Sequence, residues 1–127
     1  MIGYVTIGTN DMPRALAFWD ALLGEVGGRR AIDFGPRGAL YAAAPGPMLG
    51  VMAPYDGNKA TPGNGNMVAL AAADHAEVDK LYHKALALGA TDEGAPGPRG
   101  GEDSDFYAAY FRDLDHNKIC AYHWRKG

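Results

Sequence analysis

The spacing of apolar residues in the first half of the chain predicts one strand, one helix and three further strands. Residues 3–8 form a β-rich run that is typical of a strand. An apolar stripe at helical spacing follows Asp11, which suits a helix N-cap, and the stripe ends at Gly24. Three short apolar segments come next, and Gly-Pro pairs between them predict turns. These strands are expected at residues 31–34, 39–43 and 48–52.

The second half of the chain repeats the same order of elements. Residues 67–71 are again β-rich, and Asp74 with Glu77 three residues later predicts the start of a helix. Gly89 closes that helix, and strands are expected at residues 91–93, 106–112 and 118–124. The doubled order of strand, helix and three strands predicts an α+β fold made of two tandem βαβββ modules.

Two segments are rich in glycine and proline and resist regular structure. Residues 54–65 lie where the two halves join, and we expect a connector there. Residues 94–104 precede a strand that is expected to help form the functional site. For this second segment the sequence leaves two alternatives, a lid or rim of the site and a plain loop, because loops of this length are often functional.

Composition narrows the class of protein. The 127 residues are 47% hydrophobic and 21% charged, which is typical of a globular domain and not of a disordered chain. The net charge of -3, with Arg125-Lys126 as the only basic cluster, disfavours a nucleic-acid partner. No apolar run approaches the about 18 residues that span a membrane. With Cys120 as the single cysteine and no signal-peptide pattern at the N-terminus, we expect a cytoplasmic protein.

Two motifs at opposite ends of the chain carry a family resemblance. The opening motif, residues 3–24, reads GYVTIGTNDMPRALAFWDALLG, and the closing motif, residues 106–122, reads FYAAYFRDLDHNKICAY. The closing turn has Leu114 and His116 where related sequences usually carry Pro and Gly. Over nearly its whole length the chain resembles the vicinal-oxygen-chelate superfamily, also called the glyoxalase/bleomycin-resistance/dioxygenase family.

The resemblance implies a glyoxalase-type fold in which both modules curl into an open, cup-like mixed sheet with the helices outside. It implies one domain over residues 1–127, with a first module at about residues 1–56, a linker at about 57–65 and a second module at about 66–127. Some members of the family bind drugs without a metal, and in these two chains form two sites. We therefore expect a homodimer.

Metal-dependent members of the family take His or Glu ligands from the first and last strand of each module. Register against the two motifs places these four positions on Tyr4, Gly50, Met67 and Cys120. A phenol, a missing side chain, a thioether and a thiol are a poor ligand set for a hard or borderline divalent ion. The resemblance therefore implies no metal and no cofactor, and it disfavours the lyase, epimerase and dioxygenase chemistry that depends on a metal.

Alternation along the strands places further side chains on the same face as these four positions. The side chains on that face are mostly apolar or contain polarizable sulfur, with two phenols and one hydroxyl as polar groups. The face therefore suits an aromatic or apolar ligand. An anionic ligand would need a rim arginine such as Arg112 or Arg99. The predicted ligand-binding residues are Tyr4, Thr6, Met48, Gly50, Met52, Met67, Ala69, Cys120, Tyr122 and Arg112.

Four functions are compatible with this sequence. A metal-free protein that binds a small molecule, or confers resistance to one, is favoured. A metal-independent lyase or isomerase would use Tyr4 and a rim residue as acid and base. A glyoxalase-like enzyme with atypical metal ligands and a protein-interaction module with a closed cup are the other two. The expected partner is a small molecule, with no nucleic acid and no membrane, and catalytic residues cannot be assigned.

Overall fold

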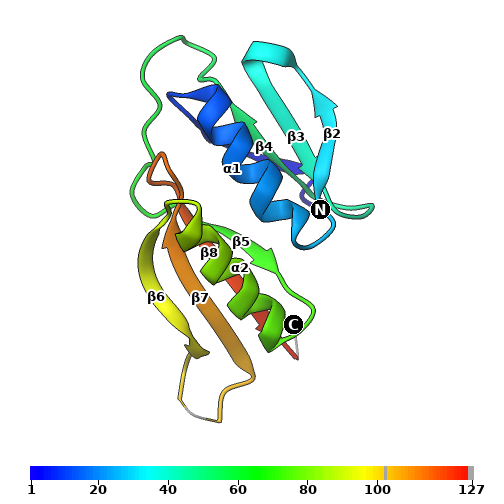
Figure 1. The fold of residues 1–127 in the computed structure, drawn as a ribbon, viewed down its shortest axis with the longest axis vertical. Helices are drawn as coiled ribbons and strands as arrows, with labels where there is room; N and C mark the ends of the chain where they lie inside the picture. The colour runs from blue at the N-terminus through cyan, green and yellow to red at the C-terminus, as the bar shows by residue number, and fades with distance from the viewer. Residues whose placement is uncertain (102, 126–127) are drawn as a thin grey trace. The chain divides into compact units, whose positions relative to one another are not determined.

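The first module forms one mixed four-stranded sheet with a helix on one face (Figure 1). The structure, a computed structural model, describes residues 1–101 and 103–125, and contacts divide the chain into two compact units, Met1–Gly63 and Asn64–Gly127. In the first unit the strand order is β1-β4-β3-β2, with β1 parallel to β4 and the other pairs antiparallel. Its elements are β1 (Tyr4–Gly8), α1 (Met12–Gly24), β2 (Arg29–Asp33), the short 3-10 helix η1 (Gly35–Arg37), β3 (Gly38–Ala42) and β4 (Met48–Met52).

The second unit repeats this arrangement with a sheet of order β5-β8-β7-β6. Strands β5 and β8 are parallel, and the other pairs are antiparallel. The prediction of an α+β fold with two βαβββ modules is therefore confirmed, and each module forms its own four-stranded sheet. The elements are β5 (Val68–Ala71), α2 (His75–Ala87), β6 (Thr91–Pro98), β7 (Phe106–Arg112) and β8 (Lys118–Trp124).

Both helices begin where the capping residues predict. The carboxylate of Asp11 accepts a hydrogen bond from the backbone N–H of Arg14 at 3.2 Å. In the second unit, Asp74 accepts from the N–H of Glu77 at 2.8 Å, and the Glu77 carboxylate accepts from the N–H of Ala73 at 3.0 Å. Two otherwise unpaired N–H groups are thus satisfied reciprocally, which fixes the start of α2.

Strand β6 is longer than the sequence pattern predicts. Its expected end at residue 93 is wrong, because the strand continues to Pro98 and takes in half of the segment expected to be a loop. Its pairing with β7 shifts register on both sides of Gly94, whose φ of 158° favours glycine. At the edge of a sheet such irregularities and prolines are tolerated, since one side of the strand needs no partner. Residues 54–65 contain no helix or strand, as expected.

Each helix packs on one face of its own sheet and forms the core there. Helix α1 contacts β2, β3 and β4, whereas α2 contacts β6, β7 and β8 (Figure 1). Trp19 and Leu22 of α1 and Val51 of β4 are at most 1% exposed. In the second unit Leu81 of α2 and Phe111 of β7 are completely buried. Among the described residues of each unit, no helix packs on the opposite face of the sheet, and this asymmetry separates core side chains from those available to a ligand.

Tyrosine hydroxyls of each sheet form hydrogen bonds with the helix that packs on it. The Tyr41 hydroxyl on β3 donates to the Asp20 carboxylate of α1 at 2.7 Å, and Tyr107 on β7 donates to Asp79 of α2 at 2.7 Å. Arg30 on β2 also binds Asp20 through two N–H groups, at 2.7 and 2.9 Å. These bonds fix the register of helix against sheet in addition to apolar packing.

The turn that joins β7 to β8 is held by a buried carboxylate. Asp113 is 3% exposed and accepts hydrogen bonds from the N–H groups of Asp115 and Asn117, both at 2.9 Å. His116 adopts a φ of 67°, a conformation that glycine takes more easily. The Asp113 carboxylate is therefore buried beneath the turn and holds the backbone of the turn in place.

Neither helix in residues 1–101 and 103–125 has the length and apolar character needed to cross a membrane.

The stability of the first unit should fall in acid because Asp20 loses its charge. The Arg30 guanidinium hydrogen-bonded to Asp20 lowers the pKa of that carboxyl below its ordinary value. A carboxyl with a lowered folded-state pKa stabilises above its unfolded pKa, and this stabilisation is lost as the pH falls through the folded pKa. We expect Asp20→Asn to reduce the acid-dependent loss in the free energy of unfolding by about 1 kcal/mol or less, since the pair is partly exposed.

Denaturant unfolding followed between neutral pH and pH of about 3 measures this difference. Equal pH dependence in the variant and the wild type would contradict the role given to Asp20.

Candidate functional site

The open face of the first sheet carries five of the predicted ligand-binding residues. Tyr4 lies opposite Met48, Thr6 opposite Gly50, and Gly8 opposite Met52 in the parallel pairing of β1 with β4. Because side chains alternate along a strand, Tyr4, Thr6, Met48, Gly50 and Met52 all point away from α1. Tyr4 is 59% exposed on this face.

Gly50 has a steric role at the centre of this face. A Cβ atom on Gly50 would lie 2.8 Å from the Cδ2 atom of Leu40 and 2.9 Å from the Cγ2 atom of Thr6. Both distances are shorter than real Cβ contacts, so a larger residue would displace the two neighbours. Glycine thus keeps the floor of the face shallow and lets Leu40 and Thr6 close over the backbone of β4.

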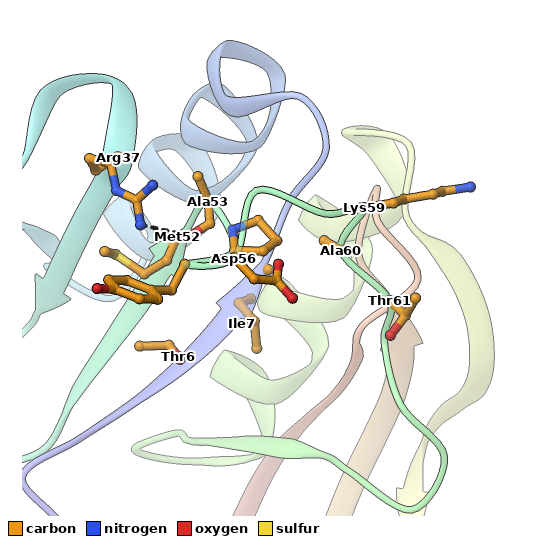
Figure 2. A pocket seen from close by; sticks show the side chains of 12 residues that line it. Thr6, Ile7, Arg37, Met52, Ala53, Asp56, Lys59, Ala60 and Thr61 are labelled. Atoms are coloured by element: carbon orange, nitrogen blue, oxygen red, sulfur yellow. Dashed lines mark hydrogen bonds between the residues drawn. The ribbon is translucent and has the colours of Figure 1, made fainter.

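A pocket of about 500 Å³ lies at one end of this face (Figure 2). Thr6 and Met52 line it from the strands, Arg37 lines it from η1, and residues 53–61 supply much of the rest. Two predicted site residues, Thr6 and Met52, are therefore part of one pocket in the structure. Sequence analysis missed Arg37, although its place in the Gly-Pro turn before β3 was a signal that it lies beside the end of β4.

The open face of the second sheet carries four more of the predicted residues. Ala69 on β5 lies opposite Cys120 on β8, and Ala71 lies opposite Tyr122. Arg112, on β7, lies opposite Lys118, two residues before Cys120, so it shares this face as well. Met67 precedes the first residue of β5 and is 48% exposed, so the strand pairing does not fix its direction.

Cys120 is fully buried and lies opposite a tyrosine that sequence analysis missed. The strand pairing places Tyr110 on β7 across from Cys120 on β8. Burial raises the pKa of the Cys120 thiol, which keeps it protonated at neutral pH. The cations of Arg99 and Lys118 lie 5.3 and 5.6 Å from the centre of the Tyr110 ring. Alternation along 106–112 was the signal that could have placed Tyr110 on the open face.

The two arginines proposed for an anionic ligand already have partners. The Arg112 guanidinium donates to the Glu93 carboxylate at 2.7 Å and to the carbonyl of His116 at 3.1 Å. Arg99 donates to the carbonyls of Ala95 and Gly97 at 2.7 and 2.9 Å. Both side chains therefore stabilise local structure, and an anion would have to bind through their remaining N–H groups.

A second pocket, of about 630 Å³, lies beside the start of α2. His75 stacks on Tyr107 there with ring centres 3.9 Å apart, and the His123 ring nitrogen Nδ1 lies 3.1 Å from the carbonyl of Ala72. Apart from Ala76, its lining is polar or charged. It lies on the helix side of the sheet and contains none of the predicted ligand-binding residues.

The four positions at which the resemblance predicts metal ligands do not offer a donor set that fits a metal. Tyr4 and Gly50 offer a phenol and no side chain, while Met67 and Cys120 offer a thioether and a buried, protonated thiol. Within the described ranges, no three His, Cys, Asp or Glu side chains lie where they could hold an ion together. This donor set does not suit the divalent ions that such sites bind.

A family model matches residues 1–121 and is described as the Glyoxalase/Bleomycin resistance protein/Dioxygenase superfamily. The chain belongs to this superfamily. The fold of paired βαβββ modules agrees with that membership, and the superfamily includes proteins with more than one activity, so membership alone does not assign a reaction.

Solved structures of superfamily proteins are similar to this chain. A glyoxalase/bleomycin resistance protein from Albidiferax ferrireducens T118 is 36% identical, with a TM-score of 0.84 and coverage of 97% of this chain and 98% of that one. A family enzyme from Burkholderia phytofirmans PsJN is 22% identical, with a TM-score of 0.76 and coverage of 95% and 96%. A lactoylglutathione lyase from Agrobacterium tumefaciens is 17% identical, with a TM-score of 0.70 and coverage of 97% and 92%. The last two show the fold alone. No curated protein matches the chain.

The thiol of Cys120 should be unreactive in the folded protein. Thiolates react and thiols do not, and both burial and the raised pKa keep the thiolate population small. We expect an aromatic disulfide reagent to modify native protein at least about a hundredfold more slowly than protein unfolded in denaturant. Absorbance of the released thiolate measures both rates. Rapid modification of the native protein would show that Cys120 is accessible and would contradict its burial.

Proposed function

We propose that this superfamily member binds a small apolar or aromatic molecule on the open faces of its sheets, without a metal ion. The observation that carries the proposal is the chemistry of one surface: the five predicted residues on β1 and β4 that share the open face of the first sheet include no acid, no histidine and no cation. Two methionines and a phenol supply adaptable apolar area there, with the hydroxyl groups of Tyr4 and Thr6 as polar contacts.

Tyr4 is the proposed polar anchor of this surface. It stands on β1 directly opposite Met48, at a position where metal-dependent relatives carry a ligand, and its ring is well exposed. An exposed aromatic side chain among flexible methionines offers a stacking surface with a hydroxyl at its end. Tyr122, which is half-buried on the open face of the second sheet, offers the same chemistry.

The second candidate function is that of a glyoxalase-like lyase or isomerase, either metal-independent or with atypical metal ligands. The feature that favours it is again Tyr4, because a phenol at the former ligand position is able to transfer a proton. This function predicts that a bound compound is converted into a product, which mass spectrometry of the ligand after incubation detects. Recovery of unchanged ligand favours binding alone.

Removal of the Tyr4 hydroxyl should weaken binding with little effect on folding. A thermal-shift screen of metabolites and antibiotics identifies a ligand through the rise in melting temperature that binding causes. For that ligand, we expect Tyr4→Phe to lower affinity by about 0.5–1.5 kcal/mol, the usual contribution of a neutral hydrogen bond. The melting temperature of the free variant should equal that of the wild type, because the hydroxyl has little packing to lose. Unchanged ligand affinity in Tyr4→Phe would show that Tyr4 is a packing residue and does not hydrogen-bond the ligand.

Protein purified without added metal should contain far less than one equivalent of any transition metal. The reason is the ligand set of Tyr4, Gly50, Met67 and Cys120, which offers a divalent ion no strong donor. Elemental analysis of the protein before and after dialysis against a chelator makes the measurement. A stoichiometric ion that the chelator removes only slowly would exclude the metal-free proposal and favour the enzyme with atypical ligands.

A further inference from the structure

Arg37 is a cation at the pocket of the first unit that has no acidic partner. Two other arginines of this unit are paired, Arg30 with Asp20 and Asp33, and Arg14 with Asp11, whereas the exposed Arg29 on β2 does not line the pocket. Within residues 1–101 and 103–125, no carboxylate lies within ion-pair distance of Arg37, whose one side-chain hydrogen bond is a long 3.5 Å contact to the carbonyl of Ala53. Its remaining N–H groups are available to a ligand.

The backbone fixes the position of Arg37 beside the pocket. The N–H of Ala53 donates to the carbonyl of Arg37 at 2.9 Å, which joins η1 to the end of β4. The next residue, Gly38, has a φ of 129°, and a Cβ there would lie 2.0 Å from the carbonyl oxygen of Val51. Only glycine allows this approach, so the turn that presents Arg37 is built into the sheet.

Charge in this pocket favours an anion. Arg37 and Lys59 contribute two positive charges, and Asp56 contributes one negative charge. Both oxygens of Asp56 are engaged by Asn58, through its backbone N–H at 2.9 Å and its side-chain amide at 3.2 Å. Figure 2 shows Lys59 extending away from the other labelled side chains, with the guanidinium of Arg37 beside Met52 and Ala53. Arg37 is thus the cation closest to the strand residues.

We infer that Arg37 binds an anionic group of the ligand, a carboxylate, phosphate or sulfonate, while the apolar part of that ligand lies against Thr6 and Met52. The inference rests on the proposed function, because it names the class of ligand for the same open face. A guanidinium presents paired N–H donors that match the two oxygens of such a group. The pocket is therefore selective for aromatic acids over neutral compounds of the same shape.

Matched acids and amides test this selectivity directly. The probes are naphthaleneacetate, indoleacetate and phenylbutyrate, each compared with its primary amide, which keeps the shape and removes the charge. Affinities are measured by NMR titration for the wild type, for Arg37→Gln and for Arg29→Gln. The last is the control, since Arg29 is an exposed arginine of β2 that does not line the pocket and its change alters net charge equally.

The expected result is that at least one acid binds about tenfold more tightly than its amide, a typical effect of a hydrogen-bonded charge. Arg37→Gln should remove this advantage and leave amide binding unchanged, whereas Arg29→Gln should keep it. Added salt should reduce the advantage as well, because the pocket is open to solvent.

Other outcomes distinguish failure of the anion site from failure of the proposed aromatic-binding function. If acids and amides bind equally well, or if Arg37→Gln and Arg29→Gln weaken the acid equally, Arg37 is no anion site, while binding of apolar molecules stands. If no member of any pair binds, both the proposed aromatic-binding function and the anion site are wrong. Loss of both acid and amide binding in a folded Arg37→Gln variant would assign Arg37 a structural role and also overturn the anion site.

Discussion

The packing of one helix against one face of a four-stranded sheet is the constraint on which each module depends. A helix with an apolar stripe covers three strands and buries their inward side chains, among them Val51 and Phe111. Strict alternation along the strands then sends every second residue to the face without a helix. The same interaction therefore builds the core and selects the side chains that a ligand is able to contact.

Polar groups near each helix–sheet contact are satisfied within the module. The carboxylates of Asp20 and Asp79 accept from tyrosine hydroxyls of the sheet, and Asp113 accepts from its own turn. No side-chain nitrogen or oxygen that is buried in the described part of the chain lacks a partner. Because desolvated polar groups are costly when unpaired, these bonds are structural. Arg37 differs from them, since its guanidinium has no carboxylate partner among the described residues and faces a pocket.

The open faces explain how a superfamily fold can keep its architecture and change its chemistry. Strand pairing does not depend on the identity of Tyr4, Gly50 or Cys120, because backbone hydrogen bonds do not depend on which side chain points outward. A Cβ atom on Gly50 would meet Leu40 and Thr6, and Cys120 is fully buried opposite Tyr110. The open face of the first sheet carries apolar side chains of β1 and β4 with Arg37 at its pocket, whereas that of the second sheet also carries Arg112 and Lys118.

The sequence by itself determined the element order, both helix N-caps and the face shared by Tyr4, Thr6 and Met52, because these follow from local periodicity and capping. The homodimer and the cytoplasmic location are predictions from sequence as well. Only the tertiary structure extended β6 to Pro98, paired Arg112 with Glu93 and left Arg37 without an acidic partner. Each of these depends on contacts between segments far apart in sequence, and no local pattern specifies which charged side chains meet when separate strands are brought together.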